Sequence, residues 1–357
     1  MDMMKRRNDI KRLRQLVGLL LVALCMMACT TETYPGDSMA ADKDEPMPIR
    51  LRMRPNINIG TEEEEWPIAG RPMARATTDD SNSSLPTDDY YGVFIIDEET
   101  YQNLADREAS LAGYKTYGYV NEKAKLEGGE LKREDGTYFF YPKAKTQDTN
   151  AYIFVYWPYQ AGLTLTELMD GIEVNVDPDQ SSSLTNSDVL AGWIKVLTTN
   201  GFKDVSSLAS PSSYPKLKMF HVMSHLTIAY EHTTAADETL SAETLSATLG
   251  NVHTKAKLNL FESLQNNSIS VSDANTPNEI KLTPNEYSKT PVDNKVTATF
   301  YALVPPQNIE TSGANVTMTI NGAPQPRNFY PSNPEDAPTA WAAGKKYKYK
   351  YTYMTGE

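Results

Sequence analysis

Cysteine is nearly absent from this sequence. Its 357 residues contain only Cys25 and Cys29, both near the start. The rest of the chain therefore has neither a disulfide framework nor a thiolate metal site. Histidine is scarce too, and His221 and His225 are the only close pair. Their i, i+4 spacing permits two metal contacts, but no third ligand stands nearby in the sequence. We expect no metal and no cofactor.

Motifs of catalysis are also missing. The sequence has no G-x-S-x-G element to expose a nucleophilic serine and no glycine-rich phosphate loop. Gly128 and Gly129 stand between Glu127 and Glu130, in a charged turn. A pair of carboxylates for glycoside hydrolysis has no specific support, because 46 acidic residues always offer some pair. We expect that this protein is not an enzyme, and a hydrolase is the least favoured function.

The first residues carry an export signal. Six basic residues precede an apolar run from Leu16 to Ala28. That run of about thirteen residues is shorter than the roughly 20 that a membrane-spanning helix needs. Residues 1–28 are therefore predicted to be a signal peptide that is removed. The basic residues are Lys5, Arg6, Arg7, Lys11, Arg12 and Arg14.

The end of this run, Met26-Met27-Ala28-Cys29, is similar to the bacterial lipoprotein box. In such proteins the cysteine is acylated, for example with palmitate, and becomes the new N-terminus. We expect lipid attachment at Cys29, with residues 29–47 as a polar tether and the outer-membrane lipid as a partner. Cys25 fits less well, because the bulky Leu24 precedes it. The alternative is a signal peptide that is cut elsewhere.

Charge and length limit the partners and the architecture. Without residues 1–28 the formal charge moves from −12 to about −16. Such an acidic chain repels phosphate groups, which argues against nucleic acid and anionic lipid surfaces as partners. About 330 residues are too many for one ordinary core, so we expect two domains. The Ser/Pro-rich stretch 206–215 divides them into residues 48–205 and 214–357.

Residues 49–59 alternate between apolar and polar side chains. The apolar residues all fall on odd positions, with arginine or asparagine between them. This period of two predicts a strand with one buried face, interrupted only by Pro55. The apolar residues are Ile49, Leu51, Met53, Ile57 and Ile59. The polar segment 61–89, which contains four consecutive glutamates, is predicted to be a loop.

The rest of the pattern is almost wholly β. Short alternating runs separated by Gly, Pro, Asn and Asp predict an all-β protein made of antiparallel sandwiches. Short helices are expected only around 98–111 and 164–169. The predicted strands are 91–96, 117–120, 138–141, 152–156, 172–176, 193–197, 217–219, 226–230, 256–261, 269–271, 296–304, 316–320 and 346–353. In the last of these, tyrosines alternate with lysines, which discourage edge-to-edge pairing.

Five stretches together resemble the fimbrillin family, the pilins of the Bacteroidales. The aromatic strand Tyr152–Tyr159 and the Asp-Val-Leu segment Ser187–Gly192 are similar to motifs of the first domain. Leu217–Leu226 resembles the strand that opens the second domain, with His225 in place of the usual lysine. The turn Ala302–Gln307 and the terminal Ala343–Tyr349 match late motifs of the family.

The resemblance implies two tandem transthyretin-like β-sandwich domains and export as an outer-membrane lipoprotein. In the family an arginine-specific protease removes the N-terminal strand, and a strand of another pilus subunit takes its place. Here the strand 49–59 would be displaced. Arg75, followed by Ala76 in the polar loop, is the preferred trimming site, because Arg71 precedes Pro72. The alternative is that Arg75 is only a surface arginine.

Stalk subunits of the family carry a C-terminal donor strand, whereas this sequence stops four residues after Tyr353. We therefore expect a tip or accessory subunit, with a host or bacterial surface receptor as a possible partner. Alternatively, strand 346–353 is detachable and is itself the donor. A second function stays open, because 21 tyrosines and four tryptophans could bind sugars on a monomeric surface glycan-binding lipoprotein.

Overall fold

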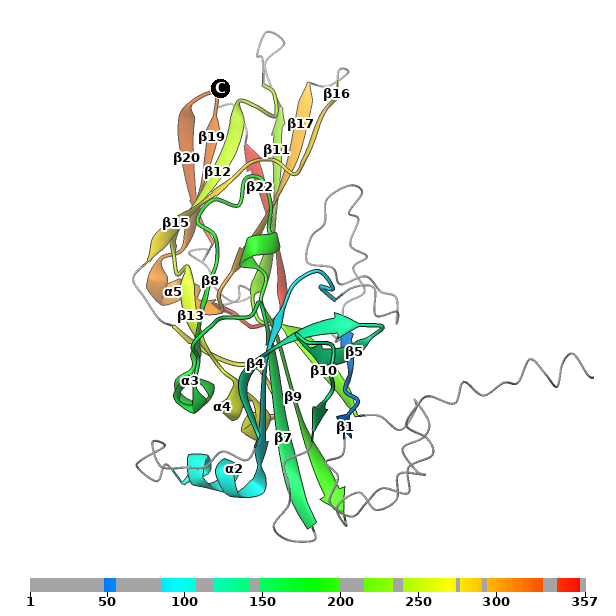
Figure 1. Ribbon diagram of the computed structural model, residues 1–357. Coiled ribbons are helices and arrows are strands. Elements are labelled where there is room, and N and C mark those ends of the chain that lie inside the picture. The colour runs from blue at the N-terminus through cyan, green and yellow to red at the C-terminus, as the bar shows by residue number, and fades with distance from the viewer. Residues whose placement is uncertain are drawn as a thin grey trace, which may run out of the picture. The chain divides into compact units, whose positions relative to one another are not determined.

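The computed structural model describes residues 48–55, 85–106, 118–140, 148–199, 215–233, 240–273, 277–290, 294–329 and 339–353. These residues form mainly β-strands with a few short helices between them (Figure 1). Burial follows the alternation of the sequence, as in β19 (Asn315–Ile320), where every second side chain is buried. None of the helices described is both long and apolar enough to cross a membrane.

Seven strands form a sheet that closes into a barrel. Their order is β10-β2-β5-β4-β3-β7-β9, and all neighbours are antiparallel except β10 and β2. β1 (Pro48–Ile49) and β6 (Phe139–Phe140) pair separately. Side chains from these strands fill a common interior cluster. The barrel strands are β2 (Arg52–Pro55), β3 (Tyr91–Asp97), β4 (Tyr119–Glu127), β5 (Glu130–Arg133), β7 (Asp148–Trp157), β9 (Leu190–Thr199) and β10 (Lys216–His221).

Two four-stranded sheets share a second core. The inward side chains of both sheets belong to one hydrophobic cluster, as expected of a sandwich. The first sheet has the order β16-β17-β11-β22, and β22 runs parallel to β11 at its edge. The strands are β16 (Glu286–Thr290), β17 (Lys295–Val304), β11 (Ser224–Thr233) and β22 (Lys346–Tyr353) in one sheet, and β15 (Asn278–Leu282), β12 (Leu245–Val252), β19 and β20 (Ala323–Asn328) in the other.

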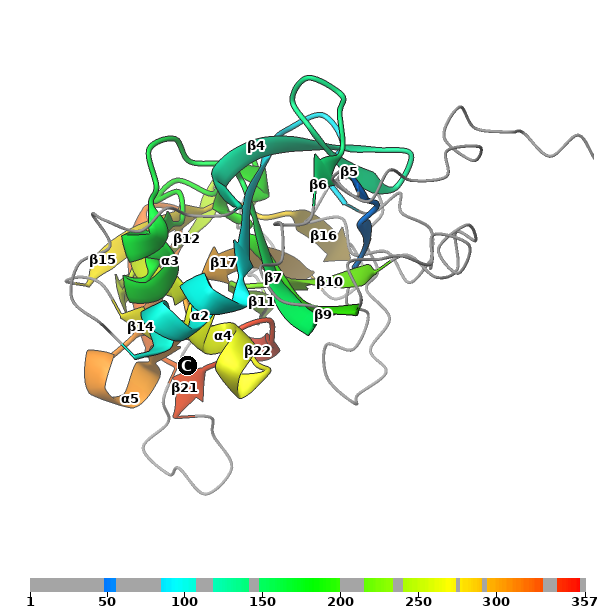
Figure 2. The ribbon, with the colours of Figure 1, turned by 60° about the horizontal axis from the view of Figure 1, so that its bottom comes forward.

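Smaller elements complete the described part. A three-stranded sheet has the order β14-β13-β8, and β18 pairs with β21. The helices α2, α3 and α4 lie close together (Figures 1 and 2), and Tyr101 of α2 stacks on Tyr152 of β7 and on Phe261 of α4. The bounds are β8 (Ile172–Asn175), β13 (Lys255–Asn259), β14 (Ser270–Asp273), β18 (Gln307–Asn308), β21 (Ala340–Trp341), α2 (Glu98–Ala105), α3 (Leu165–Asp170), α4 (Leu260–Asn266), α5 (Ile309–Ser312) and a 3-10 turn at Thr185–Ser187.

The all-β class with sandwich-like sheets and few short helices is confirmed. The closed barrel and the two parallel strand pairs were not expected, because alternation shows which face of a strand is buried but not which way its neighbour runs. The strands that were not predicted are β5, β12, β15, β16, β18, β20 and β21. The strand expected at 256–261 ends at Asn259, whose side chain accepts a hydrogen bond from the Glu262 N–H at 2.8 Å and begins α4.

Strand pairs join the two regions expected to be separate domains. β10 follows the predicted junction but pairs with β9 and β2, which precede it. β13, from the second region, pairs with β8 of the first. Residues 200–214, which hold most of the junction, lie outside the described residues. The division at 205 and 214 therefore stays a prediction.

Candidate functional site: the N-terminal strand

Residues 48–55, called the N-terminal strand below, lie within the folded sheets. They comprise β1, which pairs with β6, and β2, which pairs in parallel with β10 at four positions and with β5 at Arg52. The side chains of Ile49, Leu51 and Met53 point into the barrel interior and are 1%, 2% and 0% exposed. The apolar face of this strand is therefore part of the core.

Hydrogen bonds hold the N-terminal strand on both sides. The Arg52 N–H donates to the carbonyl of Pro215 at 3.0 Å, on the side of β10. On the other side, Met53 N–H donates to the carbonyl of Gly129, and Leu131 N–H donates to that of Leu51. Gly129 belongs to the turn between β4 and β5, where Gly128 and Gly129 adopt φ values of 58° and 82° that favour glycine.

The polar face of the strand meets a buried carboxylate. Arg50 Nε lies 3.3 Å from Glu130 Oε2, and Arg52 Nε lies 4.0 Å from Glu130 Oε1. The hydroxyl of Tyr138 donates to Glu130 Oε2 at 2.9 Å, and the Arg50 guanidinium lies over the Tyr138 ring. Burial and the contact with Glu130 raise the pKa of Tyr138, so its hydroxyl stays protonated.

The remaining predicted site residues lie outside the described residues. These are Cys29, where the lipid is expected, and Arg75 and Ala76, where trimming is expected. Ile57 and Ile59, the second half of the predicted displaced strand, are also outside. Lipidation, trimming and displacement therefore stay predictions.

His221 and His225 lie in different surroundings. His221 Nδ1 is 2.9 Å from Asp188 Oδ1, whereas His225 is buried against the ring of Tyr301. Burial lowers the pKa of His221, but the charge and hydrogen bond of Asp188 outweigh it, so the pKa is raised. Burial, Lys346 and His221 lower the pKa of His225 to about 3. Among the described residues, no cluster of three metal-binding side chains occurs.

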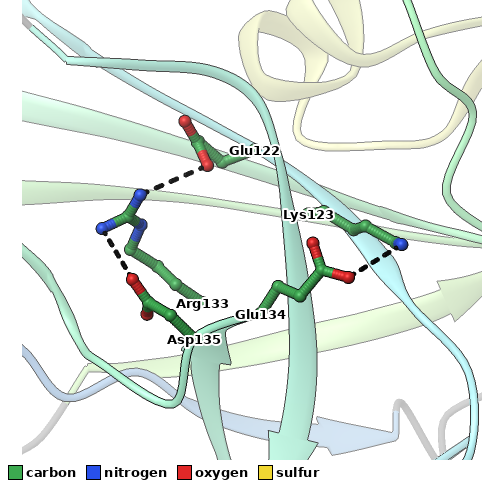
Figure 3. A pocket seen from close by; sticks show the side chains of 5 residues that line it. All are labelled: Glu122, Lys123, Arg133, Glu134 and Asp135. Carbon is green, nitrogen blue, oxygen red and sulfur yellow. Dashed lines mark hydrogen bonds and ion pairs between the residues drawn. The ribbon is translucent and has the colours of Figure 1, made fainter.

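A charged surface depression lies at the β4–β5 hairpin (Figure 3). The guanidinium nitrogens of Arg133 lie 3.7 Å from a carboxylate oxygen of Glu122 and 3.4 Å from one of Asp135. Lys123 Nζ lies 3.0 Å from Glu134 Oε1. The side chains in Figure 3 thus form ion pairs with one another. Exposed pairs of this kind stabilise a hairpin only weakly. They indicate a solvated surface rather than a ligand site.

A polar hollow lies on the sheet that contains β12, β15 and β19. Amide and hydroxyl side chains line it together with one carboxylate, and none of the lining residues is aromatic. It therefore does not provide the aromatic platform expected of a sugar-binding surface, and glycan binding stays a prediction. The hollow is lined by Thr248, Gly250, Asn251, Pro277, Asn278, Glu279, Asn315 and Thr317.

Comparison with known protein families shows which family this chain belongs to. The model of the fimbrillin-like family matches residues 74–357, most of the chain. The chain belongs to the fimbrillin-like family. Membership of this fimbrial family supports a role as a pilus subunit at the cell surface that assembles with other such subunits. No curated protein matches the chain.

Solved structures resemble this fimbrillin-like protein at low identity. A candidate cell adhesion protein of Bacteroides ovatus is 15% identical with a TM-score of 0.52, and the match covers 87% of this chain and 93% of that one. A candidate cell adhesion protein of Bacteroides uniformis is 16% identical, with a TM-score of 0.48 and coverage of 90% and 95%. The fimbrial anchor protein Mfa2 of Porphyromonas gingivalis is 11% identical, with a TM-score of 0.37 and coverage of 80% and 82%. The similarity to the Bacteroides ovatus structure supports the fold.

The fimbrillin-like motifs take defined places in the fold. Tyr152–Tyr159 runs along the end of β7, where Tyr152, Phe154 and Tyr156 are buried. Ser187–Gly192 leads into β9, and Leu217–Leu226 spans β10 and the start of β11. In the late turn, the buried Gln307 donates to the carbonyls of Pro305 and His253. These motifs are therefore largely positions of core packing.

Two residues that contact the N-terminal strand of this fimbrillin-like protein, Glu130 and Tyr138, were not predicted from the sequence as parts of a site. Glu130 was noted only as part of a charged turn, and Tyr138 only as part of a strand. Alternating arginines on the N-terminal strand indicated a polar face but not its partner. That partner lies 80 residues away from Arg50 in the sequence, and no local pattern indicates such a contact.

Proposed function

We propose that this protein is a pilus subunit whose N-terminal strand is removed and replaced by a strand of a neighbouring subunit. The observation that carries the proposal is the place of residues 48–55 in the fold: β2 lies in the barrel between β10 and β5, and β1 pairs with β6. A strand that supplies core side chains leaves a hydrophobic gap when it departs. Backbone hydrogen bonds then favour another strand in that gap, and pockets for alternate side chains determine its register.

The strength of these contacts suits exchange. Burial of Ile49, Leu51 and Met53 contributes roughly 1.5–3 kcal/mol for each side chain. Once the chain is cut, holding a separate segment also costs several kcal/mol of translational and rotational freedom. A cut strand of this length is therefore bound only moderately. A longer strand with more contacts displaces it.

Trimming after Arg75 would release the strand. The bond between Arg75 and Ala76 lies in a polar segment rich in Thr, Asp and Ser, whereas Arg71 is followed by Pro72.

The proposal includes export as an outer-membrane lipoprotein. Acylation of Cys29 would anchor the chain at the outer membrane before trimming, and removal of the lipid-bearing segment would free the subunit for the fimbrium. Several acyl chains are needed for stable anchoring, because each buried CH2 contributes only about 0.8 kcal/mol. Replacement of Cys29 by serine should leave a soluble, unlipidated precursor that enters the aqueous phase on detergent partition.

We place the protein at the tip of the pilus or in an accessory position. Its C-terminal strand β22 pairs with β11 at eight positions and packs Tyr347, Tyr349 and Tyr351 against the core of its own sandwich. The Trp341 indole N–H donates to the Tyr349 hydroxyl at 2.8 Å. These contacts support a subunit that retains β22 in its own sandwich. An exposed tip would contact a surface receptor.

The proposal is tested by cutting the purified protein with an arginine-specific protease. We expect one N-terminus at Ala76, followed by complexes with a partner subunit that survive on a native gel. An Arg75→Lys variant should resist this cut, whereas the matched Arg71→Lys variant should be cut normally. The proposal would be contradicted if the trimmed chain stayed monomeric after it was mixed with each of the other pilus subunits. A monomeric glycan-binding lipoprotein would instead keep residues 48–55 at the cell surface and be retarded on polysaccharide affinity gels.

A further inference from the structure

Glu130 contacts the N-terminal strand, so it would also contact any strand that took the place of residues 48–55. Its side chain is only 10% exposed, and it faces Arg50 and Arg52, whose side chains are 26% and 34% exposed. Two guanidinium groups thus flank one carboxylate on the polar face of the strand. Charge-assisted contacts of this kind are stronger than neutral hydrogen bonds, and more so where water is partly excluded.

In strand exchange, the two arginines would leave with the N-terminal strand, whereas Glu130 and Tyr138 would stay in the subunit. Glu130 begins β5 and Tyr138 precedes β6, so both remain when residues 48–55 leave. Glu130 then keeps the hydroxyl of Tyr138 as a donor but loses both guanidinium groups. Lys132 also interacts electrostatically with Glu130 and remains. A strand that covers this carboxylate without a cation would nevertheless replace two guanidinium groups by none, which is unfavourable for a largely buried charge.

We propose that Glu130, positioned by Tyr138, selects incoming strands that carry arginine or lysine at the places of Arg50 and Arg52. This inference rests on the proposed function, because it assumes that a strand is exchanged. The partner is thus a strand in which apolar and basic residues alternate: apolar at the places of Ile49, Leu51 and Met53, and basic between them. The acidic character of the chain also attracts such a strand before contact.

Competition between synthetic strands tests the selection. The full chain, nicked by an arginine-specific protease with all pieces retained, is mixed with a fluorescent peptide of residues 48–55. Two further peptides carry Gln or Glu at both positions 50 and 52. Fluorescence anisotropy should show that the arginine peptide binds at least about tenfold tighter than the glutamine peptide, a difference of about 1.4 kcal/mol. The glutamate peptide should bind weakest.

Variants of the acceptor identify the residue responsible. Glu130→Gln should reduce the preference to about twofold, and Glu130→Lys should make the glutamate peptide the best ligand. Tyr138→Phe, which removes only the positioning hydroxyl, should weaken the preference in part. The matched control is Glu127→Gln, because Glu127 lies opposite Glu130 on the same hairpin, is 49% exposed and pairs with Lys132. This control should keep the tenfold preference.

Salt separates charge selection from a purely structural role. The preference of the unaltered acceptor should shrink at about 1 M NaCl, where the screening length falls to about 3 Å. Equal binding of all three peptides would overturn the selection by Glu130 and leave strand exchange standing. Failure to capture any peptide, including the natural sequence, would overturn strand exchange and the selection together.

Discussion

His221 and His225 are four residues apart, yet their surroundings shift their pKa values in opposite directions. Asp188 lies against His221 and favours its charged form, whereas His225 lies in an apolar place near Lys346 and stays neutral. Sequence spacing predicted only a possible metal pair. Burial and Lys346 lower the pKa of both histidines, so the difference arises from Asp188, which the fold brings against His221 alone. It gives each histidine its own effect on stability.

His225 should make the protein less stable in acid. Its folded-state pKa of about 3 lies below the ordinary value of 6.5, so between these values the unfolded chain binds a proton that the folded chain does not. Stability therefore falls as the pH is lowered from 6.5. His225→Gln should remove this loss, worth about 2 kcal/mol at pH 5, as measured by urea unfolding at pH 8 and pH 5. An unchanged difference between these two pH values would contradict the prediction.

Asp188→Asn should lower the pKa of His221. The folded pKa is raised, so the stability from His221 is present below about pH 6.5 and lost as the pH rises through the folded value. Without the carboxylate, burial and Lys346 should bring the pKa below 6.5 in an NMR titration. We expect a loss of about 1–3 kcal/mol in stability, greater at pH 6 than at pH 9. The exposed Asp170→Asn should change neither quantity.

At the scale of elements, close packing across the sheet holds the barrel strands in register. Gly92 of β3 pairs with Tyr156 of β7, and the Tyr156 ring lies where a side chain at position 92 would stand. The Tyr156 hydroxyl donates to Asn121 Oδ1 at 2.7 Å and accepts from the Gln160 N–H. The ring is thus held in place from β4 and from the segment after β7, and it cannot move aside at low cost.

Gly92→Ala should destabilise the protein strongly. An added Cβ would lie 2.0 Å from a carbon of the Tyr156 ring, so the ring or the strand must shift. We expect a loss of about 3 kcal/mol in the free energy of unfolding, measured with urea. The same substitution in a Tyr156→Ala background should cost clearly less, because the clash is absent. Equal costs in both backgrounds would show that Tyr156 is not the cause.

The N-terminal strand offers a direct comparison of its two faces. Met53→Ala removes a side chain that is 0% exposed and should cost about 2–5 kcal/mol in unfolding experiments on the uncut chain. The neighbouring Arg54 is exposed, and Arg54→Ala should change stability by less than about 0.5 kcal/mol. Similar small effects at both positions would mean that the strand contributes little to the core.

At the scale of the whole molecule, strands from distant parts of the sequence complete the sheets. The N-terminal strand pairs in parallel with β10, and β22 pairs in parallel with β11. Parallel neighbours cannot be joined by a tight hairpin, so each pairing closes a long loop of chain. Both strands therefore depend on pairing partners that lie far away in the sequence.

Deletion of residues 345–357 tests the role of β22. The deletion removes the strand that covers Phe329 and Trp341 with Tyr349, so the sandwich should lose cooperative unfolding. Circular dichroism and thermal unfolding of the full-length and shortened chains give the comparison. A shortened chain that folds normally but no longer polymerises would instead identify β22 as a donor strand and contradict an acceptor-only role.

Alternation in the sequence by itself indicated many of the strands and which of their faces are buried, because burial on one side of a sheet imposes a period of two. It placed Ile49, Leu51 and Met53 in a core strand, and the order of the motifs indicated the fimbrillin-like family. Only the tertiary structure decided the parallel pairings, the barrel closure, and the contacts of Glu130 with Arg50 and of Asp188 with His221. These join residues far apart in the chain, and their pairing depends on the packing of all the sheets together.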